Sequence, residues 1–294
     1  MRSNSNKYLV HLALFTVAAL YAGNFSFAKW AMPEYISSYA FIVLRVGGGA
    51  LFFWVYFKLF VNEKIKDKRD YLDLAISGFF GVALNMSAFF KGLSLTTAIN
   101  ASVLMLLAPV FVVVFSAIGN KKRVKYRVIV GIAIALIGAA LLISGTNIKF
   151  SSEGLLGDAL IMINAISYAF YLYFVVRLLK KYKAITITYY IFLFGFLYVL
   201  PFGIGDLAKV DWHLMPPKAI FGIGYAVFGI TILAYLLNAW ALQRSTSTTV
   251  GSYIYLQPVL ATTIAVLVGM DVITYQKAMY AAVIVLGLWL VNRK

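Results

Sequence analysis

The stretch GLSLTTAINASVLMLLAPVFVV, from Gly92 to Val113, opens with a small polar corner and continues as an apolar run that contains Pro109. The same plan returns near the C-terminus in ALQRSTSTTVGSYIYLQPVLAT, from Ala241 to Thr262. At one fixed offset, identical residues pair as Leu93 with Leu242, Thr97 with Thr246, Leu107 with Leu256, Pro109 with Pro258, Val110 with Val259 and Gly138 with Gly287. Identities that stay in register over this span indicate an internal duplication.

The composition predicts an all-α integral membrane protein. Hydrophobic residues make up 63% of the chain and charged residues 12%, whereas soluble domains carry about 25% charged residues. The net charge of +16 lies in short basic clusters between apolar runs, which is typical of the loops of a membrane protein. The chain has no cysteine and only two well-separated histidines. We therefore expect no disulfide, no metal site, no cofactor and no nucleic-acid partner.

Ten apolar runs are long enough to cross roughly 30 Å of hydrocarbon as helices. They lie at about 8–28, 38–60, 71–90, 97–118, 124–144, 155–177, 185–203, 218–240, 248–268 and 277–291. Pro33, Pro201, Pro216 and Pro217 fall at or beyond the ends of these runs, where proline is tolerated. The first run imitates a secretory signal, with basic residues before it and small residues after it. Its apolar core is longer than a signal needs, so we interpret it as the first helix of the first repeat.

The distribution of lysine and arginine orients the bundle. With the N-terminus inside the cell, the inner segments hold nineteen of these residues and the outer segments hold six, with Arg45 left within a helix. Both termini are therefore expected in the cytoplasm. The halves 1–145 and 146–294 contain five helices each, an odd number, so the second half would enter the membrane inverted. Inverted repeats of this kind place a binding site near the midplane, and rocking around that site gives alternating access.

At this point the chain resembles the drug/metabolite transporter superfamily, in its ten-helix EamA-type branch. The residues that carry the resemblance over essentially the whole chain are Ala98, Pro109, Ala239, Leu242, Pro258, Arg45 near the start of the second helix, Gly157-Asp158 and Ser167-Tyr168-Ala169. The resemblance implies transport of small metabolites, often amino acids and their relatives. Many relatives have tryptophan where Tyr21 and Tyr168 stand, so the resemblance does not choose a substrate.

Polar side chains at membrane depth are the candidates for substrate binding, because an unsatisfied polar group in hydrocarbon costs several kcal/mol. The candidate residues are Tyr21, Asn24, Asn85, Asn100, Asn164, Tyr168, Asn238, Ser252 and Tyr255. On the ninth helix, Thr248, Ser252 and Tyr255 form one polar face, and Thr249, Tyr253 and Gln257 form a parallel row beside it. The alternative for each residue is ordinary hydrogen bonding between packed helices.

Three further features have two interpretations each. Pro109 and Pro258 would each remove a backbone hydrogen bond from a helix, and we interpret them as flexible points of two gating helices, with static kinks as the alternative. Arg45 could bind a substrate carboxylate, but an arginine at this depth more often reaches the headgroups or caps carbonyls. The small residues Gly131, Ala135 and Ala139 form a close-packing face that fits contact within the bundle or a dimer. We expect a monomer and leave the dimer open.

The function predicted from these features is facilitated export of a small organic metabolite, amino-acid-like or amphiphilic, across a bacterial cytoplasmic (inner) membrane. Its partners would be that small-molecule substrate and the lipid bilayer. Proton coupling usually needs a titratable group within the membrane, and the ten acidic residues lie in loops or first helical turns. A proton-coupled drug or metabolite exporter is the alternative. A membrane-embedded enzyme lacks a nucleophile–base pair or a metal cluster in the sequence, and a scaffold would not need an inverted duplication.

Overall fold

The structure, a computed structural model, describes residues 4–28, 30–61, 63–96, 101, 104–121, 123–144, 154–267 and 274–293. The described part contains helices, turns and short connections, and no strand. The first half consists of α1 (Asn4–Ala28), α2 (Ser38–Tyr56), η1 (Phe57–Val61), α3 (Lys68–Gly78), η2 (Phe79–Ala83), α4 (Leu84–Leu95), α6 (Ala108–Asn120) and α7 (Tyr126–Ser144). The second half consists of α8 (Leu155–Phe174), α9 (Val176–Leu179), α10 (Ala184–Leu207), η4 (Trp212–Leu214), α11 (Pro217–Gly224), η5 (Tyr225–Ala234), α12 (Tyr235–Arg244), α13 (Ser247–Ser252), η6 (Tyr253–Leu256), α14 (Gln257–Leu267) and α15 (Tyr275–Asn292). Helix overlaps every one of the ten predicted runs.

Four α-helices begin where a short polar side chain satisfies a free backbone N–H group. Ser37 accepts a hydrogen bond from the N–H of Ala40 at the start of α2, and Asp67 accepts one from Arg69 at the start of α3. Thr246 plays the same part for α13, and Thr274 for α15. These caps fix where the chain turns back into the bundle.

Within the described residues, five helical stretches are long and apolar enough to cross a membrane. They are Ser38–Val61, Lys68–Leu95, Leu155–Leu179, Ala184–Leu207 and Pro217–Arg244, and two shorter apolar helices cover Ala108–Gly119 and Tyr126–Leu142. α10 runs past the predicted end of its apolar run, so Pro201 lies inside that helix and not at its end as predicted. Together these stretches make the chain a multi-pass membrane protein.

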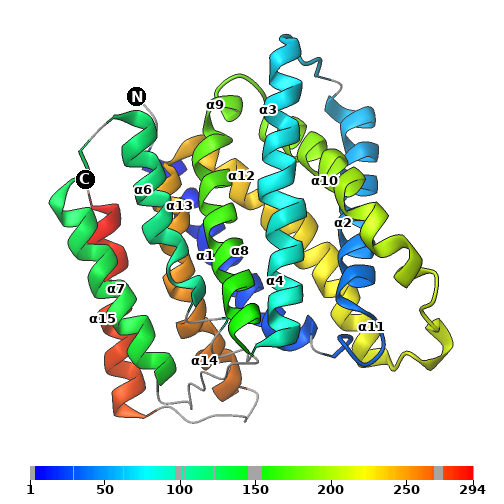
Figure 1. The fold of residues 1–294 in the computed structure, drawn as a ribbon. Helices are drawn as coiled ribbons and strands as arrows, with labels where there is room; N and C mark the ends of the chain where they lie inside the picture. Colours follow the sequence, from blue (N-terminus) through cyan, green and yellow to red (C-terminus); the bar gives the residue numbers. More distant parts are fainter. Residues whose placement is uncertain are drawn as a thin grey trace.

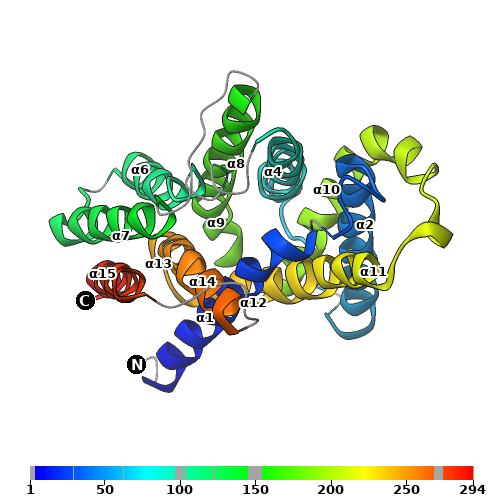
Figure 2. The same ribbon diagram turned by 90° about the horizontal axis from the view of Figure 1, so that it is seen from below.

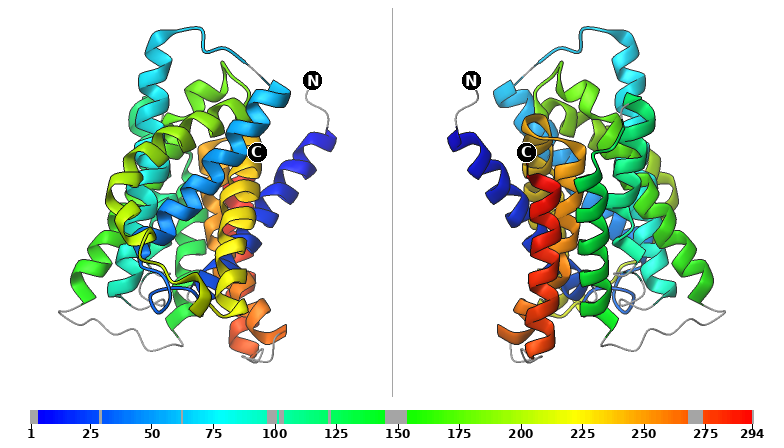
Figure 3. Two further views of the ribbon diagram at one scale, coloured as in Figure 1. Left: turned by 90° about the vertical axis from the view of Figure 1, so that its right-hand side faces the viewer. Right: turned by 90° about the vertical axis from the view of Figure 1, so that its left-hand side faces the viewer.

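The helices form one bundle, and both chain ends lie towards the same end of it (Figure 1). The connections from α2 to α3, from α6 to α7 and from α9 to α10 also lie at this end, while the connection from α10 to α11 lies at the other (Figure 1). Seen along the bundle, α6, α7, α13 and α15 gather on one side and α2, α10 and α11 on the other (Figure 2). α1 leans away from the bundle towards its N-terminal end (Figure 3). The basic connections predicted to be cytoplasmic thus share one end with the termini.

The helix boundaries of the two halves follow the offset that pairs Pro109 with Pro258. α6 begins at Ala108 and α14 at Gln257, and α7 begins at Tyr126 and α15 at Tyr275. The π-helical segment η2 falls, at the same offset, inside the π-helical segment η5. Such segments are rare and often occur at functional sites. Matching irregularities add structural support to the sequence duplication.

The two prolines stand at helix starts and not deep inside helices. Pro109 lies in the first turn of α6, directly after a turn at Leu106–Leu107, and Pro258 follows the 3₁₀ segment η6 into α14. Proline is tolerated at the first helical position, because its missing N–H would be unpaired there in any case. The sequence-based expectation of a proline within a continuous helix is therefore corrected. The helix is interrupted first, and the proline restarts it.

The small face of α7 packs within the chain. A Cβ atom added at Gly131 would lie 2.8 Å from the carbonyl oxygen of Gly287, and one added at Gly287 would lie 2.6 Å from the backbone N of Ala135. Ala135 and Ala139 are fully buried. α7 and α15 thus approach closely because both carry small residues at the contact, and this face serves the contact of α7 with α15.

Candidate functional site

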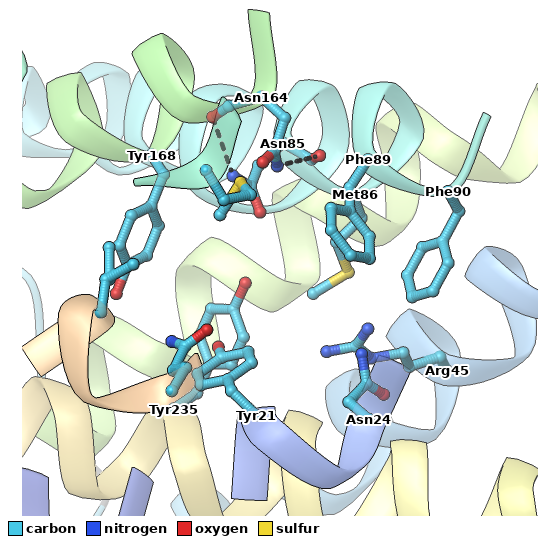
Figure 4. A pocket seen from close by; sticks show the side chains of 13 residues that line it. Tyr21, Asn24, Arg45, Asn85, Met86, Phe89, Phe90, Asn164, Tyr168 and Tyr235 are labelled. Carbon is cyan, nitrogen blue, oxygen red and sulfur yellow. Dashed lines mark hydrogen bonds between the residues drawn. The ribbon is translucent and has the colours of Figure 1, made fainter. Parts of the chain in front are cut away.

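A cavity of about 70 Å³ lies between helices of both halves (Figure 4). The residues that line it come from α1, α2, α4, α8, α12, η6, α14 and the segment before α6: Tyr21, Asn24, Arg45, Asn85, Met86, Phe89, Phe90, Met105, Asn164, Tyr168, Tyr235, Ile254 and Gln257. The cavity wall includes polar side chains: three tyrosines, three asparagines, a glutamine and one arginine. The rest of the wall is aromatic or aliphatic. A concave site with a few convergent polar groups on an apolar wall is the usual form of a small-molecule site.

Asn85 and Asn164 join two helices as well as lining the cavity. The Nδ2 of Asn164 donates a hydrogen bond to the backbone oxygen of Asn85 at 2.7 Å. The Nδ2 of Asn85 donates one to the backbone oxygen of Asn164 at 3.3 Å, and dashed lines in Figure 4 mark this pair. Both side chains are buried. Asn85 and Asn164 therefore link two packed helices, and they also line the cavity.

Tyr168 and Asn238 form a second linked pair. The Nδ2 of Asn238 donates a hydrogen bond to the hydroxyl oxygen of Tyr168 at 2.9 Å. Tyr168 faces the cavity from α8. Asn238 does not line the cavity but a separate space of about 10 Å³, which Tyr21, Gln257 and Tyr253 also line. Asn238 thus orients the ring of Tyr168.

Asn24 lies at the cavity with an unused acceptor. Its side chain is 4% exposed, and its Oδ1 atom has no hydrogen-bond partner among the described residues. Buried polar atoms are nearly always paired, so this oxygen requires a donor from water or from a bound molecule. The Oδ1 of Asn164 is unpartnered as well, but Asn164 and Asn85 each donate an Nδ2 hydrogen bond to the backbone. No such hydrogen bond to a described residue is present for Asn24.

Ser252 and Tyr255 are placed elsewhere, and Asn100 lies outside the described residues. Ser252 donates a hydrogen bond to the carbonyl of Thr249 and accepts one from Asn292. Tyr255 is fully buried in the apolar cluster that joins α6, α7 and α15. The 3₁₀ segment η6 accounts for this placement, since a tighter turn rotates the residues that follow relative to an α-helix. Of the parallel row, Gln257 lines the cavity in their place.

Arg45 enters the site from α2 with its charge unpaired. Its side chain is 4% exposed, its Nε donates a hydrogen bond to Oγ1 of Thr231 at 2.6 Å, and its guanidinium lies 5.4 Å from the centroid of the Phe90 ring. No described acidic residue forms an ion pair with it. Tyr235, also on this wall, donates a hydrogen bond to the carbonyl of Gly81 at 2.9 Å. The sequence places Arg45 within a helix but gives no signal for the direction in which its side chain points.

Among the described residues that line the cavity there is no acidic residue and no histidine. The described carboxylates make contacts elsewhere: Asp158 accepts from Thr96, Asp206 from Ser37, Asp73 pairs with Arg177, and Asp70 accepts from Lys181 and Tyr182. His11 lies 2.7 Å from the hydroxyl of Tyr253. The described part of the chain also holds no cluster of three metal-ligating side chains. The site as described offers polar and cation-mediated binding, with no group placed for acid–base or metal chemistry.

The comparisons with known proteins agree with one another. The model of the EamA-like transporter family matches residues 9–144 and again residues 155–293. An uncharacterized transporter of Archaeoglobus fulgidus is 29% identical over 252 residues, which cover 84% of this chain and 85% of the relative. The uncharacterized transporter YyaM of Bacillus subtilis is 24% identical, over 76% of this chain and 72% of the relative. A solved crystal structure shares the fold with a TM-score of 0.74 at 18% identity, covering 99% of this chain and 98% of its own.

Proposed function

This chain belongs to the EamA-like transporter family, and we propose that it carries a small organic metabolite across the membrane by alternating access around the cavity of Figure 4. The observation that carries the proposal is the cavity itself, which lies between helices of both halves and is lined by Tyr21, Asn24 and Tyr168. A transporter of inverted repeats binds its substrate at such a place.

The paired halves support this mechanism. The family model matches the two halves separately, and their helix boundaries keep one offset through α6 and α14 and through α7 and α15. We propose ten membrane spans in two inverted repeats, 1–145 and 146–294. In each repeat the fourth span is interrupted just before its proline, Pro109 or Pro258. An interrupted helix has fewer backbone hydrogen bonds to break when it bends, so these two points are suited to act as hinges.

The size of the cavity requires motion. A cavity of about 70 Å³ is smaller than the roughly 300–1,000 Å³ that is usual for small-molecule pockets. A metabolite the size of an amino acid needs more room, so the wall must widen when it binds. Met86 and Met105 line the cavity, and methionine side chains adapt readily to a changing shape.

We propose facilitated export across the cytoplasmic membrane, with both termini in the cytoplasm. The absence of an acidic residue or histidine from the described cavity wall favours movement down the gradient of the substrate over proton coupling, because coupling usually uses a titratable group in the membrane. We also propose a monomer, since the small-residue face that could serve a dimer is used by α7 and α15 within the chain.

Binding to the purified protein tests the site. Compounds that bind the folded protein raise its melting temperature, so a panel of amino acids and related amphiphiles should contain compounds that stabilise the wild type. Asn24→Ala and Tyr168→Ala should weaken this stabilisation while leaving the ligand-free protein folded. Ser252→Ala, away from the cavity, is the control and should leave the ligand response unchanged. An unchanged response in both cavity variants would show that the site is elsewhere.

A further inference from the structure

We propose that the substrate carries a carboxylate group, and that the guanidinium of Arg45 binds this carboxylate at the wall of the cavity. The inference rests on the proposed function, since it names the chemistry of the transported molecule. Its starting point is one residue: Arg45 is the cation among the residues described as lining the cavity, and no acidic residue stands beside it there.

The geometry leaves the binding edge of Arg45 available. A guanidinium has five N–H donors, and the described structure uses only the Nε donor, in the hydrogen bond to Thr231. The two terminal nitrogens have no hydrogen bond to any described residue. They form the fork that binds a carboxylate through two parallel hydrogen bonds. Figure 4 shows the guanidinium pointing into the cavity, next to Asn24 and opposite Tyr168.

The position of Arg45 argues against its reaching the membrane surface. Its Nε is fixed to Thr231, which stands at the middle of the continuous helix Pro217–Arg244. The side chain therefore reaches towards the centre of the bundle and not out to lipid headgroups. The face of Phe90 stabilises the charge from one side, because the guanidinium lies over this ring and a cation is attracted to the face of an aromatic ring. This contribution is small beside the cost of a buried, unpaired charge.

A buried cation in a membrane is usually paired with an anion or a carbonyl. Described acidic residues are engaged with other side chains near the ends of helices: Asp158 accepts a hydrogen bond from Thr96, and Asp206 accepts one from Ser37. A carboxylate brought by the substrate would neutralise Arg45 inside the cavity. The remainder of the molecule would then lie against Met86, Phe89 and the tyrosine rings. The predicted substrate is thus a small carboxylate with an apolar or aromatic remainder.

Matched acids and amides test the proposal on the intact protein in lipid nanodiscs. The probes are the twenty common amino acids, aliphatic and aromatic monocarboxylates, and the carboxamide of each compound. Several carboxylates should raise the melting temperature, and their uncharged or cationic amides should not. Arg45→Gln should weaken binding of the stabilising carboxylates by at least about 30-fold, or ~2 kcal/mol. Arg45→Lys, which keeps the charge without the fork, should fall between Arg45→Gln and the wild type.

Arg244→Gln is the matched control, because Arg244 also lies over an aromatic ring, that of Trp240, but at the helix end away from the cavity. It should leave the preference for acids unchanged. The inference is overturned if amides stabilise the wild type as well as their acids do, if no carboxylate binds, or if Arg45→Gln binds carboxylates normally. The wild-type comparison needs no variant, so it decides the matter even where Arg45→Gln does not fold.

Transport of uncharged compounds that is insensitive to Arg45→Gln would overturn this inference and leave the proposed function standing. If no compound is transported at all, both the inference and the proposed function are overturned.

Discussion

Asn85 and Asn164 exchange side-chain-to-backbone hydrogen bonds at 3.3 and 2.7 Å, and so hold α4 against α8 at the edge of the cavity. The pair joins the first half of the chain to the second. A hydrogen bond between membrane helices contributes about 0.6–2 kcal/mol. The two residues therefore stabilise the frame against which the substrate binds.

Removing either amide should destabilise the protein. We expect Asn85→Ala and Asn164→Ala each to lower the free energy of unfolding by about 1 kcal/mol, measured by thermal or denaturant unfolding in detergent micelles. Asn24→Ala is the control, because no hydrogen bond of the Asn24 side chain to a described residue is present and its oxygen is unpartnered. Equal destabilisation by Asn24→Ala would argue that burial, and not the hydrogen-bonded pair, determines the effect.

The helical segments could be predicted from the sequence because the length of an apolar run is a property of the chain alone. All ten runs overlap helix, and the offset that pairs Pro109 with Pro258 also relates the starts of α6 and α14. The π-helical segments η2 and η5 could not be predicted, since they depend on how neighbouring helices pack. Gly81 in η2 shows this dependence, because a Cβ atom there would lie 2.5 Å from the ring of Tyr171.

The site could be predicted only in part, because the rotation of a helix about its axis is not fixed by the spacing of its polar residues. Tyr21, Asn24 and Tyr168 face the cavity as expected. Tyr255 does not face the cavity. The ninth predicted helix has two polar rows, and the 3₁₀ segment η6 changes the rotation per residue, so that the row containing Tyr255 turns away from the cavity. The sequence left Arg45 open to a substrate carboxylate, the headgroups or a helix carbonyl, and only its hydrogen bond to Thr231 on a distant helix shows that it points inward.

The two proline positions should affect movement more than binding. Alanine at Pro109 or Pro258 would let an α-helix continue through the interrupted segment and stiffen it. We expect turnover to fall by roughly 3–10-fold, about 1 kcal/mol in the barrier, with little change in ligand affinity, as measured by flux and by thermal shift on the same preparations. Pro201→Ala, inside α10 and outside the paired positions, should have little effect on turnover. Normal turnover in both Pro109→Ala and Pro258→Ala would show that the interruptions are static.

A charged cluster at the end that carries the termini should contribute to stability up to high pH. Lys181 donates hydrogen bonds to both carboxylate oxygens of Asp70 at 2.8 and 3.0 Å, and Tyr182 donates one at 2.7 Å. The hydrogen bond to Asp70 raises the pKa of Lys181. A group whose pKa is raised on folding stabilises the protein below its unfolded pKa, about 10.4 for lysine, and loses this contribution as the pH rises through the folded value.

The melting temperature should therefore show no loss from this pair between pH 7 and 9. Lys181→Gln should lower the melting temperature at pH 8 and reduce the further fall above pH 10.5, whereas Lys180→Gln, its exposed neighbour, should change neither. Identical pH profiles for Lys181→Gln and the wild type would contradict the role assigned to the cluster.

The orientation of the bundle can be tested with single cysteines, since the chain has none of its own. We expect a cysteine at Arg123 to be protected from a membrane-impermeant thiol reagent on intact cells and to react once the membrane is opened. A cysteine at Lys209, in the connection at the opposite end, should react on intact cells. Labelling of position 123 but not of position 209 on intact cells would reverse the topology.

Uptake into proteoliposomes tests the central claim most directly. A radiolabelled compound that raises the melting temperature should enter vesicles that contain the protein, saturably and down its own gradient, with the same pH on both sides. Its entry should be strongly reduced by Tyr168→Ala, and adding the compound should move no protons. Uptake no faster than in protein-free liposomes would contradict transport through this cavity, and uptake that requires an imposed pH gradient would contradict facilitated movement.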